Sequence, residues 1–285
     1  MLKPLSPKTE LRLRWEASLE RIYWSLQTTE NPLSKKEMIN VLTKEQKKRL
    51  SRYKQEIVKY KKALTYISQE WLANQKPVTS KHIILLHNIA YSGRVRSTEK
   101  AIEEILDYLQ KTLENPIIQA AIAYFFLLNL APFAQGNVQT ACLVSYLFLY
   151  KYGYNFRDLL VLEEYLQRNK EEFNFMLEST SQRGNITLWL EFFTKGIAIQ
   201  VEKAVNDMFS GLFKTDLANS IWELNERQKE ILAMLEQPGA KITNKKAQRV
   251  CKISQITASR DLAKLTSVGL LFSHGKGRSV YYTRV

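Results

Sequence analysis

Cysteine, histidine and acidic side chains are scarce in this chain of 285 residues. The only two cysteines, Cys142 and Cys251, lie in separate regions, which excludes a disulfide framework. The three histidines, at positions 82, 87 and 274, have no cysteine or carboxylate beside them at metal-ligand spacing. We therefore expect no metal site.

The sequence also lacks a hydrophobic run suited to crossing a membrane. Its most apolar stretch, Ile117–Phe133, is interrupted by Gln119 and Asn129, and the first residues contain no apolar signal core. These features favour a cytoplasmic protein with no membrane partner. Hydrophobic residues still make up 45% of the chain, which is enough for a sizeable core, and the length predicts two domains.

Apolar residues recur at helical spacing over most of the first two hundred residues, and few alternate as in a strand. The clearest helical periods run through Leu11–Trp24, Glu37–Trp71 and Leu159–Leu177. The basic run Lys44–Arg49 is expected on a solvated helix face rather than in a nucleic-acid site. We also expect three acids on the surface, because no nucleophile signature lies near them: Asp158, Glu163 and Glu164.

A loop motif occupies residues 130–143, which read Leu-Ala-Pro-Phe-Ala-Gln-Gly-Asn-Val-Gln-Thr-Ala-Cys-Leu. This string resembles the signature of Fic proteins, H-P-F-x-(D/E)-G-N-G-R-x-x-R, a loop that runs into the N-terminus of a helix. Active members of that family transfer AMP from ATP to a protein hydroxyl. The chain retains the frame of the signature: Pro132, Phe133, Gly136 and Asn137.

Every ionisable side chain of that signature is replaced. Ala131 stands at the catalytic histidine, Gln135 at the metal-binding acid and Val138 at the second glycine, while Gln139 and Cys142 stand at the two arginines. A methyl group cannot accept a proton, and general-base catalysis contributes ~10²- to 10⁴-fold. A neutral amide is a poor Mg²⁺ ligand, and the positive clamp on phosphate oxygens is missing. We therefore predict a naturally degenerate site with no catalytic residue.

The start of the motif helix keeps one feature that favours an anion. Backbone N–H groups at Gly136 and Asn137, together with the helix dipole, attract negative charge. Val138 is expected to weaken this attraction, because a β-branched residue resists the positive φ that glycine allows. We expect no required cofactor and, at most, weak binding of ATP or ADP.

Blocks on both sides of the motif resemble the family in the same order. They are residues 115–126, 147–154, 165–177 and 187–193. In the third block, Lys170 stands at a family arginine and Phe173 at the first of two paired tyrosines. The resemblance implies a Fic-type helical bundle as the core of the chain.

The segment before the bundle resembles an autoinhibitory motif of the family, S-x-x-x-E-(G/N), whose glutamate pairs with the second motif arginine. Ser25 is retained, and the ungapped alignment that we prefer places Thr29 at the glutamate, whereas a one-residue gap would use Glu30. Because the arginine position is Cys142, the resemblance implies that both partners of the inhibitory pair are lost.

The target-binding flap, a β-hairpin in family members, looks shortened or lost. Residues between His87 and Pro116 show a helical period from Thr98 and leave little room for two strands. Without a flap, a target segment could not easily be held as an added strand. The sequence therefore identifies no protein target.

Positive charge is concentrated at the C-terminal end. Residues 241–285 contain six lysines and four arginines against the single acid Asp261, a net charge of +9 out of +14. This concentration is typical of a protein that binds the phosphate backbone of nucleic acid. A basic tail can also serve solubility.

The pattern in this segment predicts a winged helix-turn-helix. Three helical segments precede two short β-prone runs, and these five elements are residues 225–236, 244–250, 254–267, 270–273 and 280–283. Ala258, Leu262 and Leu265 recur at helical spacing and would face the core. The arrangement resembles the C-terminal winged helix of many bacterial Fic proteins.

Candidate DNA contacts lie on the third helix and the wing. Base edges would be approached by Gln255, Thr257, Ser259 and Arg260. Phosphates would be contacted by Lys264, Lys276 and Arg278. DNA is the expected partner, bound by a homodimer.

The sequence thus predicts a mostly α-helical chain with a small β-wing. Its parts are an N-terminal helical region (1–75), a Fic core (76–205), a linker (206–222) and a winged-helix domain (223–285). The favoured function is a DNA-binding transcriptional regulator or interaction module that has lost AMP transfer. A protein adenylyltransferase with atypical residues and a non-catalytic nucleotide sensor stay open as alternatives.

Overall fold

The computed structural model describes residues 5–43, 50–91, 95, 99–111, 114–210, 223–237, 239–275 and 277–284, without the side chains of Pro7 and Arg278. The described residues are mostly helical, as predicted, and none of their helices is long and apolar enough to cross a membrane. Contacts divide the chain into two compact units. The larger unit comprises residues 17–41 and 46–209, and the C-terminal unit comprises residues 1–16, 42–45 and 210–285.

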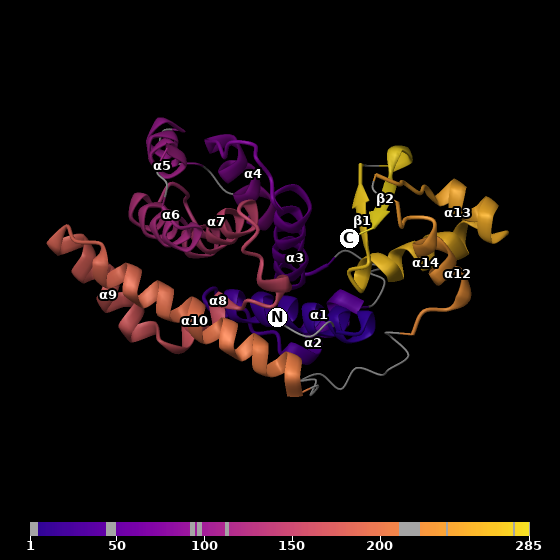
Figure 1. Ribbon diagram of the computed structural model, residues 1–285, viewed down its shortest axis with the longest axis horizontal. Coiled ribbons are helices and arrows are strands. Elements are labelled where there is room, and N and C mark those ends of the chain that lie inside the picture. The colour runs from indigo at the N-terminus through magenta and orange to yellow at the C-terminus, as the bar shows by residue number, and fades with distance from the viewer. Residues whose placement is uncertain are drawn as a thin grey trace. The chain divides into compact units, whose positions relative to one another are not determined.

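The larger unit is built from helices (Figure 1). In chain order they are the second part of α1 (Pro7–Gln27), α2 (Lys35–Thr43), α3 (Arg52–Glu70), α4 (Ser80–Ala90), α5 (Glu99–Lys111), α6 (Pro116–Leu130), α7 (Asn137–Lys151), the 3₁₀ helix η1 (Phe156–Asp158), α8 (Leu162–Arg168), α9 (Lys170–Arg183) and α10 (Thr187–Ser210). The predicted period 159–177 is broken at Asn169, between α8 and α9. The basic run 44–49, predicted on a solvated helix face, lies outside the described residues.

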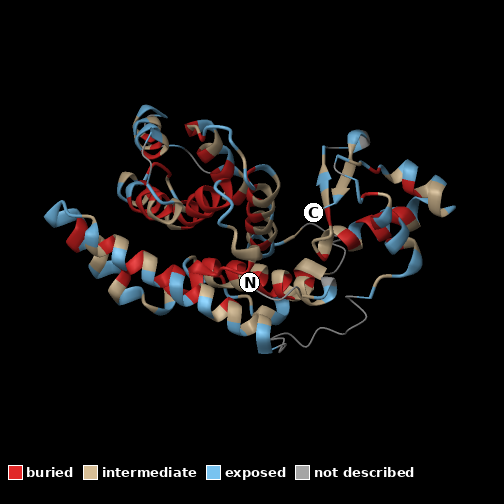
Figure 2. Cartoon of the chain, viewed as in Figure 1, coloured by how far each residue is buried: buried red, intermediate tan, exposed pale blue. Residues whose placement is uncertain are grey.

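Helix α7 lies at the centre of this unit. Its residues from Gln139 to Lys151 are all buried (Figure 2), and the helix contacts α3, α4 and α6. Neighbouring α6 starts at Pro116, where the Asn115 side chain caps the helix by accepting from the backbone N–H of Ile117. This α6–α7 pair carries the loop that resembles the Fic signature.

Aromatic packing joins α10 to α6. The indole N–H of Trp189 donates to the backbone oxygen of Ala121 at 2.8 Å. The Trp189 ring lies against Tyr124, with ring centroids 5.3 Å apart, and against Phe173, with centroids 5.8 Å apart. Because all three aromatic side chains are buried, the positions of Tyr124 and Phe173 are set by packing on several sides.

The segment between α4 and α5 is the predicted place of a shortened flap. The helical period expected from residue 98 is confirmed by α5, which begins at Glu99. Among the described residues of this segment, Val95 forms an isolated antiparallel bridge with Phe133. Residues 92–94 and 96–98 lie outside the description, so the loss of the flap stays a prediction.

The C-terminal unit contains the predicted helices and strands, with ends that differ by at most three residues from the prediction. They are α12 (Glu226–Ala233), α13 (Asn244–Cys251), α14 (Gln255–Ser267), β1 (Leu271–His274), the 3₁₀ helix η2 (Gly277–Ser279) and β2 (Tyr281–Arg284). Strands β1 and β2 pair antiparallel with Leu271 opposite Arg284, and Ile242 adds an isolated bridge to Tyr282.

Local signals account for the helix starts in this unit. A side chain caps each of the three helices: Asn225, Thr243 and Ser254. The predicted core positions Ala258, Leu262 and Leu265 are all fully buried, and Ile231 and Leu271 pack with them. One face of α14 is thereby turned inward, and the opposite face is exposed.

Candidate functional site

The loop between α6 and α7 is held by its own polar side chain. Asn137, the first residue of α7, donates from its amide to the backbone oxygen of Phe133 at 2.9 Å. Its side-chain oxygen accepts from the backbone N–H of Phe133 at 3.0 Å. The two bonds close the loop, so the Asn137 side chain has a structural role whether or not an anion binds at this helix start.

Glycine is required at position 136 by the backbone conformation and by the neighbouring side chain. It has a φ of 74°, and a Cβ at this position would lie 2.7 Å from Cγ of Tyr91. Val138 lies in the first turn of α7 and is not among the described residues with positive φ. Position 138 requires no positive φ, because the left-handed residue is Gly136. The expectation that Val138 weakens anion binding by resisting a positive φ is therefore wrong. Anion binding at Gly136 and Asn137 stays a prediction.

His87, on α4, supports the loop from inside the protein. Its ring stacks on Phe133 with centroids 3.7 Å apart, and its Nδ1 lies 2.9 Å from Oγ1 of Thr140. Since the Thr140 hydroxyl donates to the backbone oxygen of Gly136 at 2.8 Å, Nδ1 of His87 carries the proton and donates. Burial lowers the pKa of His87 to about 4, so the ring is neutral near pH 7. Sequence reasoning gave His87 no role, although it follows the buried Ile83 by one helical turn.

The two residues at the arginine positions are buried and uncharged. The side-chain amide of Gln139 donates to the hydroxyl of Thr28, in the turn after α1. Cys142 lies beside Glu163, and burial raises the pKa of its thiol well above the ordinary value. The start of α7 therefore presents no fixed positive charge from these positions.

The segment that resembles the inhibitory motif meets α7 through neutral groups. Ser25 is buried, and the Thr29 hydroxyl donates to the backbone oxygen of Leu26 at 3.0 Å. Glu30 is exposed and has a φ of 55°. The contact between the two segments is made by Thr28 and Gln139, one residue before the position that the ungapped alignment assigns.

Glu163 and Glu164 were expected on the surface, and this expectation is wrong: they are 4% and 5% exposed. Glu163 accepts hydrogen bonds from the hydroxyls of Tyr60 at 2.9 Å and Tyr146 at 2.7 Å. Burial raises the pKa of Glu163, and the nearby positive charge of Arg21 opposes that rise. The sequence misled because α8 carries acids on its inward side, where Glu163 is satisfied by the distant residues Tyr60 and Tyr146.

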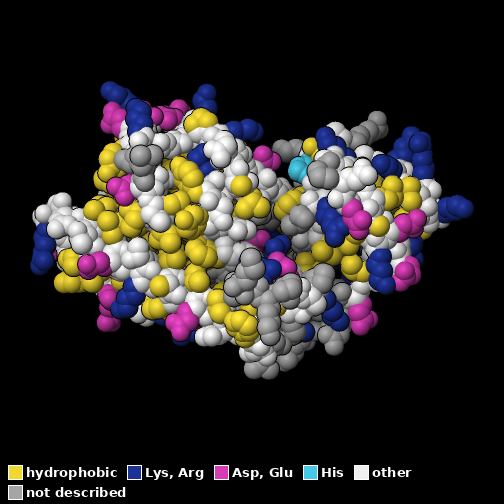
Figure 3. All heavy atoms as spheres, in the orientation of Figure 1, with side chains coloured by type: hydrophobic (Ala, Val, Ile, Leu, Met, Phe, Trp, Pro, Cys, Tyr) yellow, Lys and Arg dark blue, Asp and Glu magenta, His cyan; other side chains and the backbone are white. Residues whose placement is uncertain are grey.

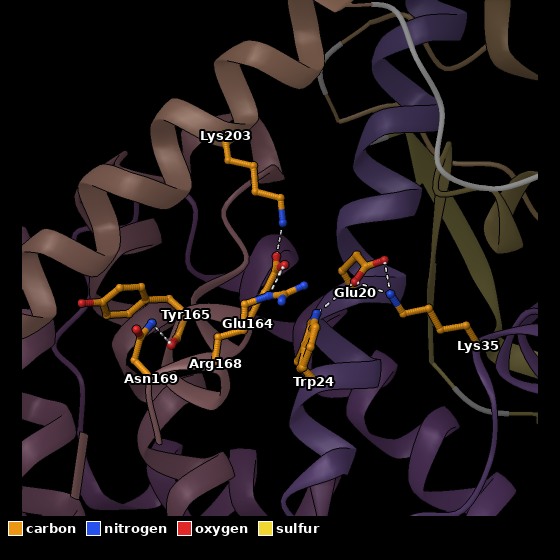
Figure 4. Close-up of polar contacts among 8 residues, drawn as sticks. All are labelled: Glu20, Trp24, Lys35, Glu164, Tyr165, Arg168, Asn169 and Lys203. Atoms are coloured by element: carbon orange, nitrogen blue, oxygen red, sulfur yellow. Dashed lines mark hydrogen bonds and ion pairs between the residues drawn. The ribbon is translucent and has the colours of Figure 1, made fainter. Parts of the chain in front are cut away.

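Glu164 joins α8 to α10 (Figure 4). It forms ion pairs with Arg168, at 3.0 Å, and with Lys203. The Arg168 guanidinium lies 4.9 Å from the centre of the Trp24 ring, and the Trp24 indole N–H donates to Glu20 at 3.0 Å. Trp24 is thus held from two sides.

A cavity of about 210 Å³ opens between α1, α6, α7, α8 and α9. Its wall contains four of the predicted site residues: Ser25, Val138, Gln139 and Cys142. Ala131 and Gln135 are exposed on the loop and do not line it. Sequence reasoning missed other wall residues, among them Trp24, Tyr124 and Glu163.

The residues present do not suit Mg²⁺ and a triphosphate, which the Fic resemblance implies. Residues 131–137 include no carboxylate, and Gln139 and Cys142 carry no charge to neutralise phosphate oxygens. In the described part of the chain, no group of three or more His, Cys, Asp or Glu side chains is placed to hold a metal ion.

The candidate DNA-contact residues of α14 divide by exposure. Gln255 and Arg260 are exposed, and the side chain of Asn244 donates to the exposed Ser259 hydroxyl at 2.8 Å. The hydroxyl of Thr257 is bonded to that of Ser254 at the helix start. Lys264 is partly buried, and its Nζ donates to the backbone oxygen of Glu223 at 2.8 Å. The Lys276 residue and the Arg278 side chain lie outside the described residues.

The exposed face of α14 also carries an apolar residue that sequence reasoning missed. Ile256 is 65% exposed, one turn before Arg260. The only acid after residue 240, Asp261, is buried, pairs with Arg227 at 3.0 Å and accepts from Gln228 at 2.7 Å. Because Arg227 partners this acid, Asp261 does little to reduce the positive potential of the outer face.

Solved structures identify the class of the fold. A Fic family protein from Desulfovibrio desulfuricans G20 matches with a TM-score of 0.60 and 15% identity over 99% of this chain and 97% of that one. A Fic domain containing signaling protein from Bacteroides thetaiotaomicron VPI-5482 matches with a TM-score of 0.63 and 18% identity over 75% and 95% of the two chains. Fic-1 from C. elegans matches with a TM-score of 0.61 and 19% identity over 72% and 66%. The chain therefore has the Fic fold.

A family model refines this assignment. Residues 37–149 match the model of the Fic/DOC family, so this part of the chain is a Fic/DOC domain. The match includes the loop from Ala131 to Asn137 and nearly all of α7. No curated protein matches the sequence.

Proposed function

We propose that this Fic-fold protein has lost AMP transfer and acts in the cytoplasm as a transcriptional regulator, through a winged helix in its C-terminal unit that binds DNA. The loss of transfer is supported by the chemistry of the motif positions. Ala131 offers no proton acceptor, and Gln139 and Cys142 offer no charge to stabilise a phosphoryl transition state.

The outer face of α14 is the observation that carries DNA binding. Ile256 and Arg260 are exposed on one side of this helix and Gln255 is exposed at its first position, while Ala258 and Leu262 are buried. An exposed arginine and glutamine suit the hydrogen-bonding edges of guanine and adenine, and an exposed apolar group suits the thymine methyl. We propose that α14 is the recognition helix.

The helix before α14 supplies charge for the phosphates. Lys245, Lys246 and Arg249 are exposed on α13, and Lys252 is exposed in the turn that follows. Lys and Arg side chains project from the end of the C-terminal unit that carries α13 (Figure 3). In this proposal α13 and the wing contact the backbone, and α14 reads the bases.

Fluorescence anisotropy with labelled duplexes at 50 mM salt tests the proposal. The full chain should bind, and a duplex enriched by selection from random sequence should bind more tightly than the unselected pool. Arg260→Ala should weaken binding to the enriched duplex by about tenfold. Arg183→Ala changes an exposed arginine of the larger unit and should have no effect. Absence of binding to any duplex at 50 mM salt contradicts the proposal.

Label transfer from α-labelled ATP tests the loss of chemistry. The unmodified chain with Mg²⁺ and cell lysate should transfer no label. A variant with Ala131→His, Gln135→Asp, Val138→Gly, Gln139→Arg and Cys142→Arg regains the groups of the family signature and serves as the positive comparison. Transfer by the unmodified chain at the rate of this variant excludes the proposed loss.

The remaining part of the proposal concerns how DNA binding depends on nucleotide and on dimer formation. DNA binding should need no cofactor, and ATP or ADP should raise the melting temperature only at concentrations that indicate weak binding. We propose that a homodimer binds two half-sites. Sedimentation of the DNA complex should give two chains per enriched duplex, and one chain per duplex rules out this arrangement.

A further inference from the structure

The cavity beside α7 has apolar walls that are fixed before any ligand arrives. Trp24, Tyr124 and Phe173 supply aromatic surface to it. Trp24 is held by Glu20 and Arg168 (Figure 4), and Trp189 packs against both Tyr124 and Phe173. A rigid concave site with aromatic walls is the usual form of a small-molecule site.

The hydroxyl of Tyr124, a residue of this wall, is buried and lacks a partner among the described residues. The Tyr124 side chain is fully buried, and its hydroxyl makes no hydrogen bond to any residue that the structure describes. Burial raises the pKa of Tyr124 well above its usual value, so the hydroxyl keeps its proton and is a donor. The nearby carboxylate of Glu163 already accepts one hydrogen bond on each oxygen, from Tyr60 and Tyr146. An unpaired buried donor is costly, and a ligand oxygen would remove that cost.

The open end of the cavity carries a positive charge. Lys170, the first residue of α9, lines the cavity and is exposed. No described residue forms an ion pair or hydrogen bond with its ammonium group. Its position at the rim suits an anionic group that remains in contact with water.

The same features disfavour a nucleotide. Sites for drug-sized ligands span roughly 300–1,000 Å³, and this cavity of about 210 Å³ is smaller. Among the described residues that line the cavity, Lys170 is the only cation, and the wall also contains the carboxylate of Glu163, which repels a polyanion. The occupant should be smaller than a nucleotide and should carry a single negative charge.

We propose that this cavity binds a small, mostly apolar molecule with an uncharged oxygen at its buried end and one carboxylate at its open end. The buried oxygen accepts from the hydroxyl of Tyr124, the apolar body lies between Trp24 and Phe173, and the carboxylate pairs with Lys170. The proposal is independent of DNA binding by the C-terminal unit.

Titration calorimetry with three related probes tests the two contacts. Two of the probes each differ from the first at one end. The first, 4-hydroxybenzoate, carries both groups; benzoate lacks the buried oxygen; and 4-hydroxybenzamide lacks the charge. The unmodified chain should bind 4-hydroxybenzoate about threefold to tenfold more tightly than benzoate. It should also prefer 4-hydroxybenzoate over 4-hydroxybenzamide by about twofold to fivefold, since an exposed ion pair is weak.

Single variants should each remove one preference and leave the other. Tyr124→Phe deletes the donor but keeps the ring, so benzoate and 4-hydroxybenzoate should bind equally. Lys170→Gln should abolish the preference for the charged probe over the amide. Lys62→Gln changes an exposed lysine of α3 outside the cavity wall and serves as the matched control for Lys170→Gln. Melting curves confirm that each variant is folded.

Two results would overturn the proposal. One is the absence of binding of all three probes to the folded chain at millimolar concentration. The other is a preference pattern that survives both Tyr124→Phe and Lys170→Gln, because the probes would then bind elsewhere. Competition in which ATP displaces 4-hydroxybenzoate at micromolar concentration would identify the cavity as a nucleotide site and also contradict the proposal.

Discussion

Ala131 ends α6 in a left-handed backbone conformation, with φ 42° and ψ 55°, that alanine tolerates poorly. Glycine adopts this conformation without a steric cost, and Ala131 is exposed, so Ala131→Gly removes no buried contact. We expect this change to raise the free energy of unfolding by about 0.5–1 kcal/mol in urea denaturation. Ala134→Gly is the matched control in the same loop: because Ala134 is not among the described residues with positive φ, it should not stabilise the protein.

His87 should make stability depend on pH. Below pH 6.5 the unfolded chain takes up a proton on this side chain, whereas the folded chain does so only near pH 4, where its pKa lies. The unfolded state therefore binds more protons in this window, and stability falls as the pH decreases through it. We expect a loss on the order of 2 kcal/mol between pH 7 and pH 4 from this group.

Urea denaturation at pH 7.0, 5.5 and 4.5 measures this contribution against a His87→Gln variant. The variant should be less stable than the unmodified chain at pH 7, because it loses the stacking on Phe133. The difference between the two proteins should shrink as the pH falls. A constant difference at all three values is the result that disproves the prediction.

At the scale of elements, α8 and α10 approach closely at a glycine. A Cβ added to Gly196 on α10 would overlap the ring of Tyr165 on α8. Alanine in a helix is ordinarily more stable than glycine by about 1 kcal/mol. Here the overlap should reverse the sign, and Gly196→Ala should destabilise the larger unit by about 1–3 kcal/mol.

Thermal and urea unfolding test the close approach of these helices. Gly196→Ala should cost less stability in a chain that already carries Tyr165→Leu than in the unmodified chain, because the smaller side chain makes room for the methyl group. If Gly196→Ala stabilises the protein as it would an isolated helix, the two helices do not approach as described.

At the scale of the whole molecule, charge governs the proposed binding to DNA. Each phosphate neutralised by a lysine releases a counterion, so the logarithm of the affinity falls with the logarithm of salt concentration with a slope of about −0.9 per contact. Replacing Lys245 and Lys246 by alanine should reduce the magnitude of that slope by about 2. Lys62→Ala, in the larger unit, should leave it unchanged. Anisotropy titrations between 50 and 300 mM salt measure the slope, and an unchanged slope for the double variant excludes α13 from the phosphate contacts.

Short-range features of this protein could be predicted from the sequence. Periodicity predicted the helices of the C-terminal unit, and the capping side chains of Asn225, Thr243 and Ser254 accept from backbone N–H groups three residues further along the chain. These interactions are local, so they depend little on the rest of the fold. The period did not predict the break at Asn169 between α8 and α9, where the Asn169 side-chain amide donates to the backbone oxygen of Tyr165 at 2.8 Å.

The sequence by itself determined which chemical groups stand at the motif positions, because a side chain that is absent cannot be restored by folding. Only the tertiary structure decided that Glu163 is buried, that Asn137 closes its own loop and that the Tyr124 hydroxyl lacks a partner beside a cavity. These properties depend on neighbours from distant parts of the chain, such as Tyr60 on α3 and Trp24 on α1. Burial and hydrogen bonding are set by which elements meet, and a local sequence pattern carries little information about that meeting.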